Sequence, residues 1–405
     1  METFLNTSRT YHQYEAGNMT SRERVVAAMN LQEPDRVPVM CQLSMGHYLV
    51  NLDLDPAQYW IRNDLIIDAF MRLAERYHFD GILINLPGRD PRAGDYVDRI
   101  EQTPDAEVIH YTDGGRCVCP YDDLAVHVEA PKMDIGDIGP QLLFYEDPHT
   151  LGGLKTPPFY YDLKPYQWRG EELFPEHMFA IIDGVLAAVG DRLSVHSEVF
   201  SPFTQLLERA GYESALIGLI QAPDQCHAIL QAYTEGTCAL AKKQAARGVD
   251  AVLISSAFAG GGFISRAMYQ EFVLPYERQV AAAVKQTPAK VYTHTCGAIG
   301  DRLELMAATG IDGIDTMDPP PLGNTELADA KQQVGDRLFL KGNIDPVNVL
   351  LQGSVDAVRE DAGRKLEAAK AGGGYILSSA CSVAPRVPPE NLLVLHEVIA
   401  EAGRY

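Results

Sequence analysis

The sequence predicts a (β/α)8 TIM barrel, an α/β fold in which eight parallel strands alternate with helices. Short apolar runs alternate with amphipathic segments along most of the 405 residues, as in parallel βαβ units. Polar side chains also recur where the predicted strands end, which is where barrel enzymes carry their active sites. The chain exceeds the roughly 250 residues of a compact barrel. We therefore expect an N-terminal arm at 1–19 and a single barrel domain at 20–405, with an inserted region at about 87–175.

The first strands follow an N-terminal helix. Thr20, Ser21 and Glu23 form a capping-box pattern, and the helix that begins there ends before Pro34. A strand, a long helix and a second strand are expected next, at 37–43, 56–77 and 81–86. The order strand, helix, strand is that of a parallel unit.

The region at 87–175, after the second strand, departs from this alternation. It is rich in Pro, Gly and Asp, and we interpret it as a lid or accessory region. Residues 108–119 within it indicate a β-hairpin, because the Asp-Gly-Gly at its centre supplies the positive φ angles of a tight turn. Cys117 and Cys119 are interpreted as structural, since no second cysteine pair lies near them in the sequence to complete a metal site.

The alternation resumes after this region and continues to the C-terminus. The six remaining strands are expected at 193–199, 251–256, a run that ends in His294 and Cys296, 313–317, 338–344 and 375–379. The helices between and after them are expected at 203–210, 224–246, 266–285, 301–309, 325–333, 355–371 and 389–403.

Three soft ligands lie at the ends of two of these strands. His294 and Cys296 are two residues apart, and in a strand such residues point to the same face. Cys381 follows a second apolar run, at 374–378. Two thiolates and one imidazole form a zinc site with an open fourth position, which is the catalytic arrangement. The alternative is a pair of buried free cysteines and a core histidine, but the barrel places all three at the catalytic face and favours the metal site.

Other polar residues share the predicted strand ends: Gln42, Asn85, Glu198, Ser255, Asp318, Asn343 and Asp345. The candidate catalytic residues among them are Glu198, Asp318 and Asn343. The candidate substrate-binding residues are Gln42, Asn85 and also His196, which shares a strand face with Glu198. For each of them singly, a hydrogen bond that orders a loop is the alternative.

Composition and net charge limit the partners and the cellular compartment that we expect for this protein. The formal net charge of −21 disfavours nucleic acid as a partner. No apolar run reaches the roughly 18 residues of a membrane span, and the first 19 residues lack the apolar core of a signal peptide. Seven scattered cysteines fit a reducing compartment, so we expect a cytoplasmic protein. The Gly260-Gly261-Gly262 run is interpreted as a flexible turn, because it fits no nucleotide-binding fingerprint.

Five motifs carry a resemblance to a known family: Arg22-Glu23-Arg24-Val25, Pro34-Asp35-Arg36-Val37-Pro38, Ser201-Pro202-Phe203-Thr204, His294-Thr295-Cys296-Gly297, and Cys381 with Pro388-Pro389-Glu390-Asn391. In these motifs the chain resembles the uroporphyrinogen decarboxylase superfamily, in particular its zinc- and cobamide-dependent methyltransferase branch. The resemblance implies a (β/α)8 barrel in which zinc is held by His294, Cys296 and Cys381. It also implies a corrinoid (cobalamin) carried by a partner protein, and it is weakest between residues 87 and 175.

The decarboxylase branch of the superfamily fits less well. Its members carry arginines after the first strand, where this chain has Gln42-Leu43-Ser44-Met45-Gly46. They carry Asp-Ile-Leu in the second strand, where Asp80 here stands one position early, and Gly-His-Gly where this chain has Ala380-Cys381-Ser382. Decarboxylation of uroporphyrinogen is therefore a distant alternative.

The expected function is zinc-dependent transfer of a methyl group from a small methyl donor to the cobalt of a corrinoid-binding protein. Aromatic residues of the inserted region, with Tyr160 and Trp168 as candidate substrate-binding residues, favour O-demethylation of a methoxylated aromatic. The alternative is that these aromatic residues pack the insertion onto the barrel. The two cysteine ligands suit the alternative of a methylcobamide:thiol methyltransferase of the coenzyme M type. A barrel scaffold with structural zinc is the non-enzymatic alternative, and three protein ligands in place of four argue against it. A homodimer is possible.

Overall fold

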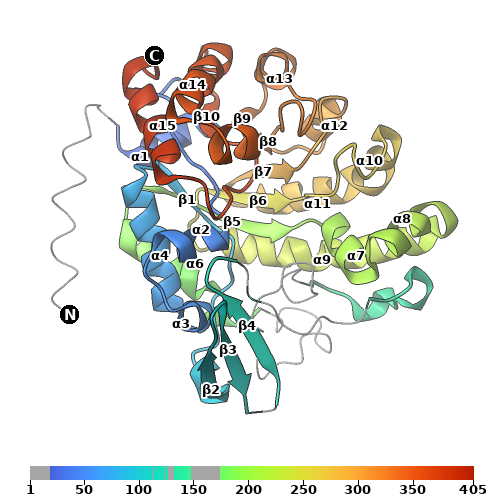
Figure 1. Cartoon of the computed structure of the whole chain (residues 1–405). Coiled ribbons are helices and arrows are strands. Elements are labelled where there is room, and N and C mark those ends of the chain that lie inside the picture. The colour runs from blue at the N-terminus through green and yellow to red at the C-terminus, as the bar shows by residue number, and fades with distance from the viewer. Residues whose placement is uncertain (1–18, 113, 124, 126–131, 147–173) are drawn as a thin grey trace.

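The fold is seen in a computed structural model, which describes residues 19–112, 114–123, 125, 132–146 and 174–405. Seven parallel strands form one curved sheet in the order β1-β5-β6-β7-β8-β9-β10 (Figure 1). They are β1 (Gly81–Ile84), β5 (Ser194–Phe200), β6 (Ala251–Ser255), β7 (Lys290–Thr295), β8 (Gly313–Thr316), β9 (Phe339–Ile344) and β10 (Tyr375–Ser379). The predicted α/β barrel class is thereby confirmed.

The expected first strand at 37–43 closes the sheet without becoming a regular strand, and this corrects the prediction. Val39 forms an isolated parallel bridge with Leu377 of β10, while its carbonyl accepts a hydrogen bond from Asp80 N beside β1 (2.8 Å). Pro38 has no N–H, and the N–H of Val39 is donated to the side chain of Asp80 (2.9 Å). Two successive residues therefore lack a ladder donor, yet the segment still spans the space between the two edge strands.

Helices lie around the outside of the sheet (Figure 1). They are α1 (Ser21–Met29), α2 (Met45–Asn51), α3 (Pro56–Ile61), α4 (Asn63–Arg76), α6 (Ala180–Val189), α7 (Pro202–Ala210), α8 (Tyr212–Gln221), α9 (Pro223–Ala245), α10 (Arg266–Phe272), α11 (Leu274–Val284), α12 (Leu303–Ala307), α13 (Leu327–Val334), α14 (Val355–Ala369) and α15 (Pro389–Ala402). The expected helix at 56–77 is divided because Arg62 is extended (φ −122°). The helix expected at 266–285 is divided at Val273, two residues before Pro275, because proline lacks the N–H that a continuous helix needs.

The N-terminal end of the barrel is closed by α1. Its Val25, Ala28 and Met29 pack with residues that point into the barrel, among them Leu83 and Tyr292. The capping box predicted at its start is present, with reciprocal bonds between Thr20 and Glu23. Since this end is plugged, the carboxyl ends of the strands form the end at which a site can open.

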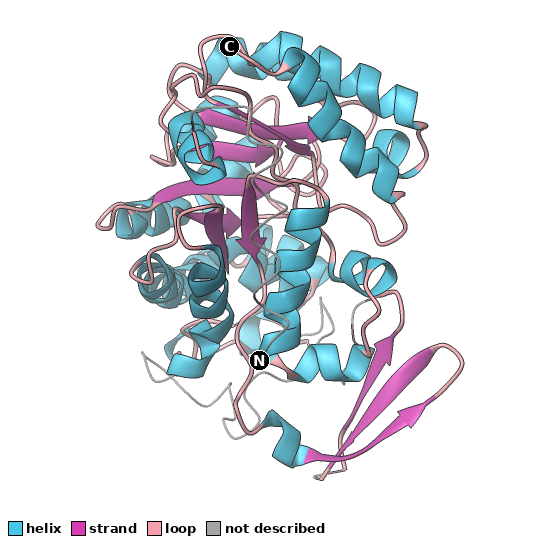
Figure 2. Cartoon of the chain, turned by 90° about the vertical axis from the view of Figure 1, so that its left-hand side faces the viewer, coloured by secondary structure: helices cyan, strands magenta, loops and turns pink. Residues whose placement is uncertain are grey.

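A separate antiparallel sheet stands beside the barrel (Figure 2). Its strands are β2 (Val97–Gln102), β3 (Ala106–Tyr111) and β4 (Arg116–Pro120), and β3 pairs with β4 as the predicted hairpin. Cys117 and Cys119 are buried in β4, with their sulfurs 4.0 Å apart. Residues 147–173 lie outside the described residues, so the lid interpretation of 87–175 stays a prediction. None of the helices that the structure describes has the length and apolar character needed to cross a membrane.

Candidate metal centre

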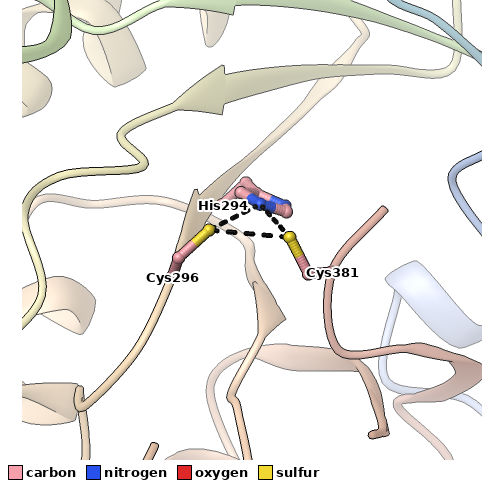
Figure 3. A group of neighbouring side chains, drawn as sticks. All are labelled: His294, Cys296 and Cys381. Atoms are coloured by element: carbon pink, nitrogen blue, oxygen red, sulfur yellow. Dashed lines mark hydrogen bonds between the residues drawn. The ribbon is translucent and has the colours of Figure 1, made fainter. Parts of the chain in front are cut away.

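His294, Cys296 and Cys381 meet at the carboxyl ends of the strands (Figure 3). His294 belongs to β7, and Cys296 follows directly after that strand. Cys381 follows β10, which is separated from β7 by β8 and β9. The Cys296 sulfur lies 3.4 Å from His294 Nε2 and 3.7 Å from the Cys381 sulfur, and the third side of the triangle measures 3.8 Å.

The three donor atoms fit a zinc ion. Zinc in a tetrahedral site, with bonds of about 2.3 Å to sulfur and about 2.0 Å to nitrogen, separates two sulfurs by about 3.8 Å and a sulfur from a nitrogen by about 3.5 Å. The sides of the observed triangle are close to these values. His294 is buried while both cysteines are partly exposed, so the ligand set is accessible from the sulfur side. Three ligands of this kind leave the fourth position for a substrate.

The chain turns immediately after Cys296, in the loop between β7 and α12 (residues 296–302), which we call the metal loop. Gly297 has a φ of +78°, a conformation in which a side chain would be strained. Its N–H donates to the carboxylate of Asp318 (2.6 Å). Gly260 packs against the same turn, since a Cβ there would lie 2.2 Å from the carbonyl oxygen of Cys296. Gly260 and Gly261 of the glycine run thus pack on the metal loop, whereas a Cβ on Gly262 would meet nothing within 4 Å.

Hydrogen bonds and charges tune the three ligands. Burial opposes protonation of His294, but the contacts with Asp315 and Cys381 outweigh it and raise the pKa of His294 to about 10. The hydrogen bond from Cys296 is the largest of the effects that lower the pKa of Cys381, whereas the pKa of Cys296 is raised. Cys381 is therefore the first of the two cysteines to become a thiolate, which is the form that binds metals.

The candidate catalytic residues take different positions. Asp318 lies beside the centre and orders the metal loop through Gly297, and burial raises its pKa to about 6. Asn343 is fully buried and donates to the carbonyls of Met317 (2.8 Å) and Thr325 (3.2 Å), which fits the loop-ordering alternative.

The seam between β1 and β5 holds two further candidates. Glu198 and Asn85 line a small cavity there, together with Tyr145 and Gln244. Gln42 lies near Cys381. Its backbone carbonyl accepts a hydrogen bond from the N–H of Val383 (2.8 Å), which follows Cys381 by two residues.

The surroundings of His196 fit the hydrogen-bonding alternative, and its substrate-binding assignment stays a prediction. Its Nδ1 lies 2.9 Å from the Tyr292 hydroxyl and its Nε2 lies 3.2 Å from Ser194 Oγ. His196 is fully buried, and burial lowers its pKa to about 4. The strand register sets it opposite Ala251, the first residue of β6. A neutral histidine with both nitrogens occupied is part of the barrel interior. Tyr160 and Trp168 lie outside the described residues.

Two charged residues of the centre were missed by the sequence analysis. Asp315 lies beside His294 on β8, and Lys341 lies beside Asp315 on β9. Both are almost fully buried in strands that are otherwise largely apolar. A charged residue inside such a strand is rarely tolerated without a partner, and this signal was available in the sequence.

The motif Ser201-Pro202-Phe203-Thr204, in contrast, has a structural role. Ser201 is the N-cap of α7 and accepts a hydrogen bond from Thr204 N (3.0 Å), while the Thr204 hydroxyl donates to the carbonyl of Ser255 (3.0 Å). These contacts fix the start of α7 to the end of β6.

Known proteins resemble this chain in sequence and in fold. It is 31% identical over 194 residues to uroporphyrinogen decarboxylase of Xanthomonas oryzae pv. oryzae, a match that covers 45% of this chain and 51% of that protein. It is 32% identical over 177 residues to the enzyme of the same name from Alkalilimnicola ehrlichii, covering 43% of this chain and 46% of that protein. The chain thus spans about half the length of the curated relatives it matches.

A solved structure extends the likeness of the fold. A methyltransferase from Methanosarcina mazei superposes with a TM-score of 0.68 at 18% identity, covering 95% of this chain and 99% of that one. Residues 165–402 match the family described as uroporphyrinogen decarboxylase (URO-D). Because this match spans more than half of the chain and includes all three candidate metal ligands, the protein belongs to the uroporphyrinogen decarboxylase family.

Proposed function

We propose that this protein is a zinc-dependent methyltransferase that moves a methyl group from a small methyl donor to the cobalt of a corrinoid-binding protein. The observation that carries the proposal is the triangle of His294 Nε2 and the sulfurs of Cys296 and Cys381, whose sides of 3.4–3.8 Å suit zinc. The centre opens at the end of the barrel where enzymes of this fold act. The family and the fold of the Methanosarcina mazei methyltransferase are consistent with this proposal.

Decarboxylation remains a distant alternative. The segment Gln42-Leu43-Ser44-Met45-Gly46 has no arginine to hold substrate carboxylates. Asp80 lies at the opposite end of the barrel, where it accepts hydrogen bonds from Arg24 and Arg36 (both 2.8 Å). A substrate with several carboxylates would meet two cysteine sulfurs at the candidate centre.

The chain's own residues would divide the work of methyl transfer. His294, Cys296 and Cys381 would hold the ion, and Asp318 would keep the loop after Cys296 in place. Zinc at this position would supply Lewis-acid stabilisation of the oxygen that leaves a methyl ether. In the overall reaction the methyl–oxygen bond of the ether would break, the methyl group would pass to the Co(I) acceptor of the corrinoid-binding protein, and the aryloxide would take up a proton to become a phenol.

The donor half-reaction with a methoxylated aromatic is our first choice. It is supported by the aromatic residues of the inserted region, including Tyr160 and Trp168, which lie outside the described residues. Transfer from methylcobamide to a thiol is the second candidate, because a site with two cysteines and a histidine also suits activation of a third sulfur as a thiolate.

A pair of assays separates the two directions. The zinc-loaded protein is mixed with cob(I)alamin and a methoxylated benzoate, and the expected result is loss of the Co(I) absorption with release of the phenol. The reverse mixture contains methylcobalamin and coenzyme M, and we expect no demethylation there. Activity only in the second mixture would assign the acceptor half-reaction, and inactivity of the zinc-loaded protein in both would contradict the proposed function.

A further inference from the structure

A buried row of three charged or polar side chains begins at the candidate metal ligand His294 and runs across two neighbouring strands. The strand register sets His294 of β7 opposite Asp315 of β8, and Asp315 opposite Lys341 of β9. Their exposed fractions are 6%, 2% and 1%. All three side chains point inward, as do Tyr292 and Phe339, which lie two residues earlier on the strands of His294 and Lys341.

Asp315 is the central member of this row. One of its oxygens, Oδ2, lies 3.0 Å from Lys341 Nζ and 3.5 Å from His294 Nδ1. The other oxygen accepts a hydrogen bond from Thr316 N (2.8 Å). The lysine and the backbone therefore hold the carboxylate in one orientation, with Oδ2 directed at the imidazole.

We infer that Asp315 is the positioning residue of the metal centre, and that Lys341 holds it in place. Nε2 of His294 faces the two cysteine sulfurs, and when a metal takes the lone pair of Nε2 the remaining ring proton is on Nδ1, which lies 3.5 Å from Asp315 Oδ2. This contact selects the tautomer and the ring orientation that direct the Nε2 lone pair at a metal. Carboxylates commonly orient metal-binding histidines in this way.

Lys341 makes this carboxylate tolerable inside the barrel. A buried carboxylate without a partner is costly, whereas a paired one is retained. The pair could also be present for folding alone, and the two roles predict different outcomes when both charges are removed. The inference rests on the proposed metal centre and is independent of the direction of methyl transfer.

The test is a comparison of four proteins: the full-length wild type, Asp315→Asn, the double variant Asp315→Asn/Lys341→Met, and Asp250→Asn. Zinc affinity is measured by competition with a chromophoric chelator, and stability by thermal unfolding of the metal-free protein. Asp250 is the matched control, since it is also held by hydrogen bonds, from Ser194 (2.9 Å) and Arg22 (3.0 Å), but belongs to the base of the barrel.

We expect Asp315→Asn to weaken zinc binding by roughly 10- to 100-fold, the usual effect of losing such a partner of a metal-binding histidine. The double variant removes the unpaired lysine as well, so it should regain thermal stability while zinc binding stays weak. The visible spectrum of the cobalt(II)-substituted protein should change in both Asp315 variants, because the imidazole orientation changes. Asp250→Asn should leave the zinc affinity and the cobalt spectrum as in the wild type.

Two outcomes would overturn the inference. One is a zinc affinity of Asp315→Asn within about threefold of the wild type, outside the range expected for such a partner. The other is recovery of full zinc affinity in the double variant, which would assign the pair to folding alone. Failure of the wild type to bind zinc would instead contradict the proposed function, so the two failures are distinguishable.

Discussion

Each of the three candidate ligands owes its position to a local feature of the chain. His294 faces inward because alternate residues of β7 do so, and Cys296 follows it by two residues. Gly297 turns the chain away at once, with a φ of +78°. Cys381 follows Ser379, the last residue of β10, by two residues. The soft ligands therefore converge without any large excursion of the backbone.

The ligands themselves are tested by zinc content. The wild type should hold about one zinc per chain, and the double variant Cys296→Ala/Cys381→Ala should lose it while its circular dichroism spectrum stays that of a folded barrel. The reason is that one imidazole alone does not retain the ion. Cys238→Ala is the control, because this partly exposed cysteine belongs to α9. Retention of stoichiometric zinc by the double variant would refute the site.

Contacts outside the sheet fix the loop after β6, which packs on the metal loop. Gly261 N donates to the carbonyl of Ala298 (2.7 Å), which joins the loop after β6 to the loop after β7. Arg302 donates to the carbonyls of Ala259 (2.7 Å) and Ile264 (3.2 Å) in the same loop. The Arg302 guanidinium also lies over the Tyr269 ring of α10 (5.7 Å), and the Tyr269 hydroxyl donates to Glu277 of α11 (3.1 Å). Helices and loops thus form one support for the metal loop.

This support should depend on pH through Glu277. Burial raises the pKa of this carboxyl from 4.5 to about 7, so the folded protein holds a proton that the unfolded chain releases above pH 4.5. The stability is therefore present at low pH and is lost as the pH rises through 7. Relative to Glu277→Gln, the wild type should lose up to about 3 kcal/mol of unfolding free energy by pH 8.

The measurement is urea denaturation of both proteins from pH 5 to pH 8. Glu235→Gln serves as the control, since Glu235 is an exposed carboxyl on α9 and its replacement should leave the profile of the wild type unchanged. Parallel pH profiles of the wild type and Glu277→Gln would disprove the role assigned to Glu277.

At the scale of the whole molecule, the two ends of the barrel have separate tasks. The carboxyl end carries the candidate metal centre, and the other end is closed by α1 and an ion-pair network around Asp80. Asp80 is completely buried and accepts hydrogen bonds from Arg24, Arg36 and Val39 N. It therefore joins α1, the closing segment and β1 at one point, and the residues of the N-terminal motifs that contact it have a structural role.

Removal of this carboxylate should open the closed end. Asp80→Asn leaves two arginines without their shared partner, and we expect a loss of about 3–5 kcal/mol of unfolding free energy. Asp191→Asn is the control, because Asp191 is 94% exposed in its pair with Arg22 and should cost about 1 kcal/mol or less. Calorimetry of the metal-free proteins measures both values, and equal effects of the two substitutions would contradict the role of Asp80.

The sequence by itself determined the alternation of strands and helices, the capping box of α1, the hairpin of β3 and β4, and the three soft residues at strand ends. These features depend on residue periodicity and on turn chemistry within a few neighbours. The tertiary structure decided which strands lie side by side. It therefore placed Asp315 and Lys341 in one row with His294, placed His196 at the base of the barrel and made 37–43 a closing segment. The physical reason is that register arises from hydrogen bonds between strands far apart in the chain, which local periodicity does not encode.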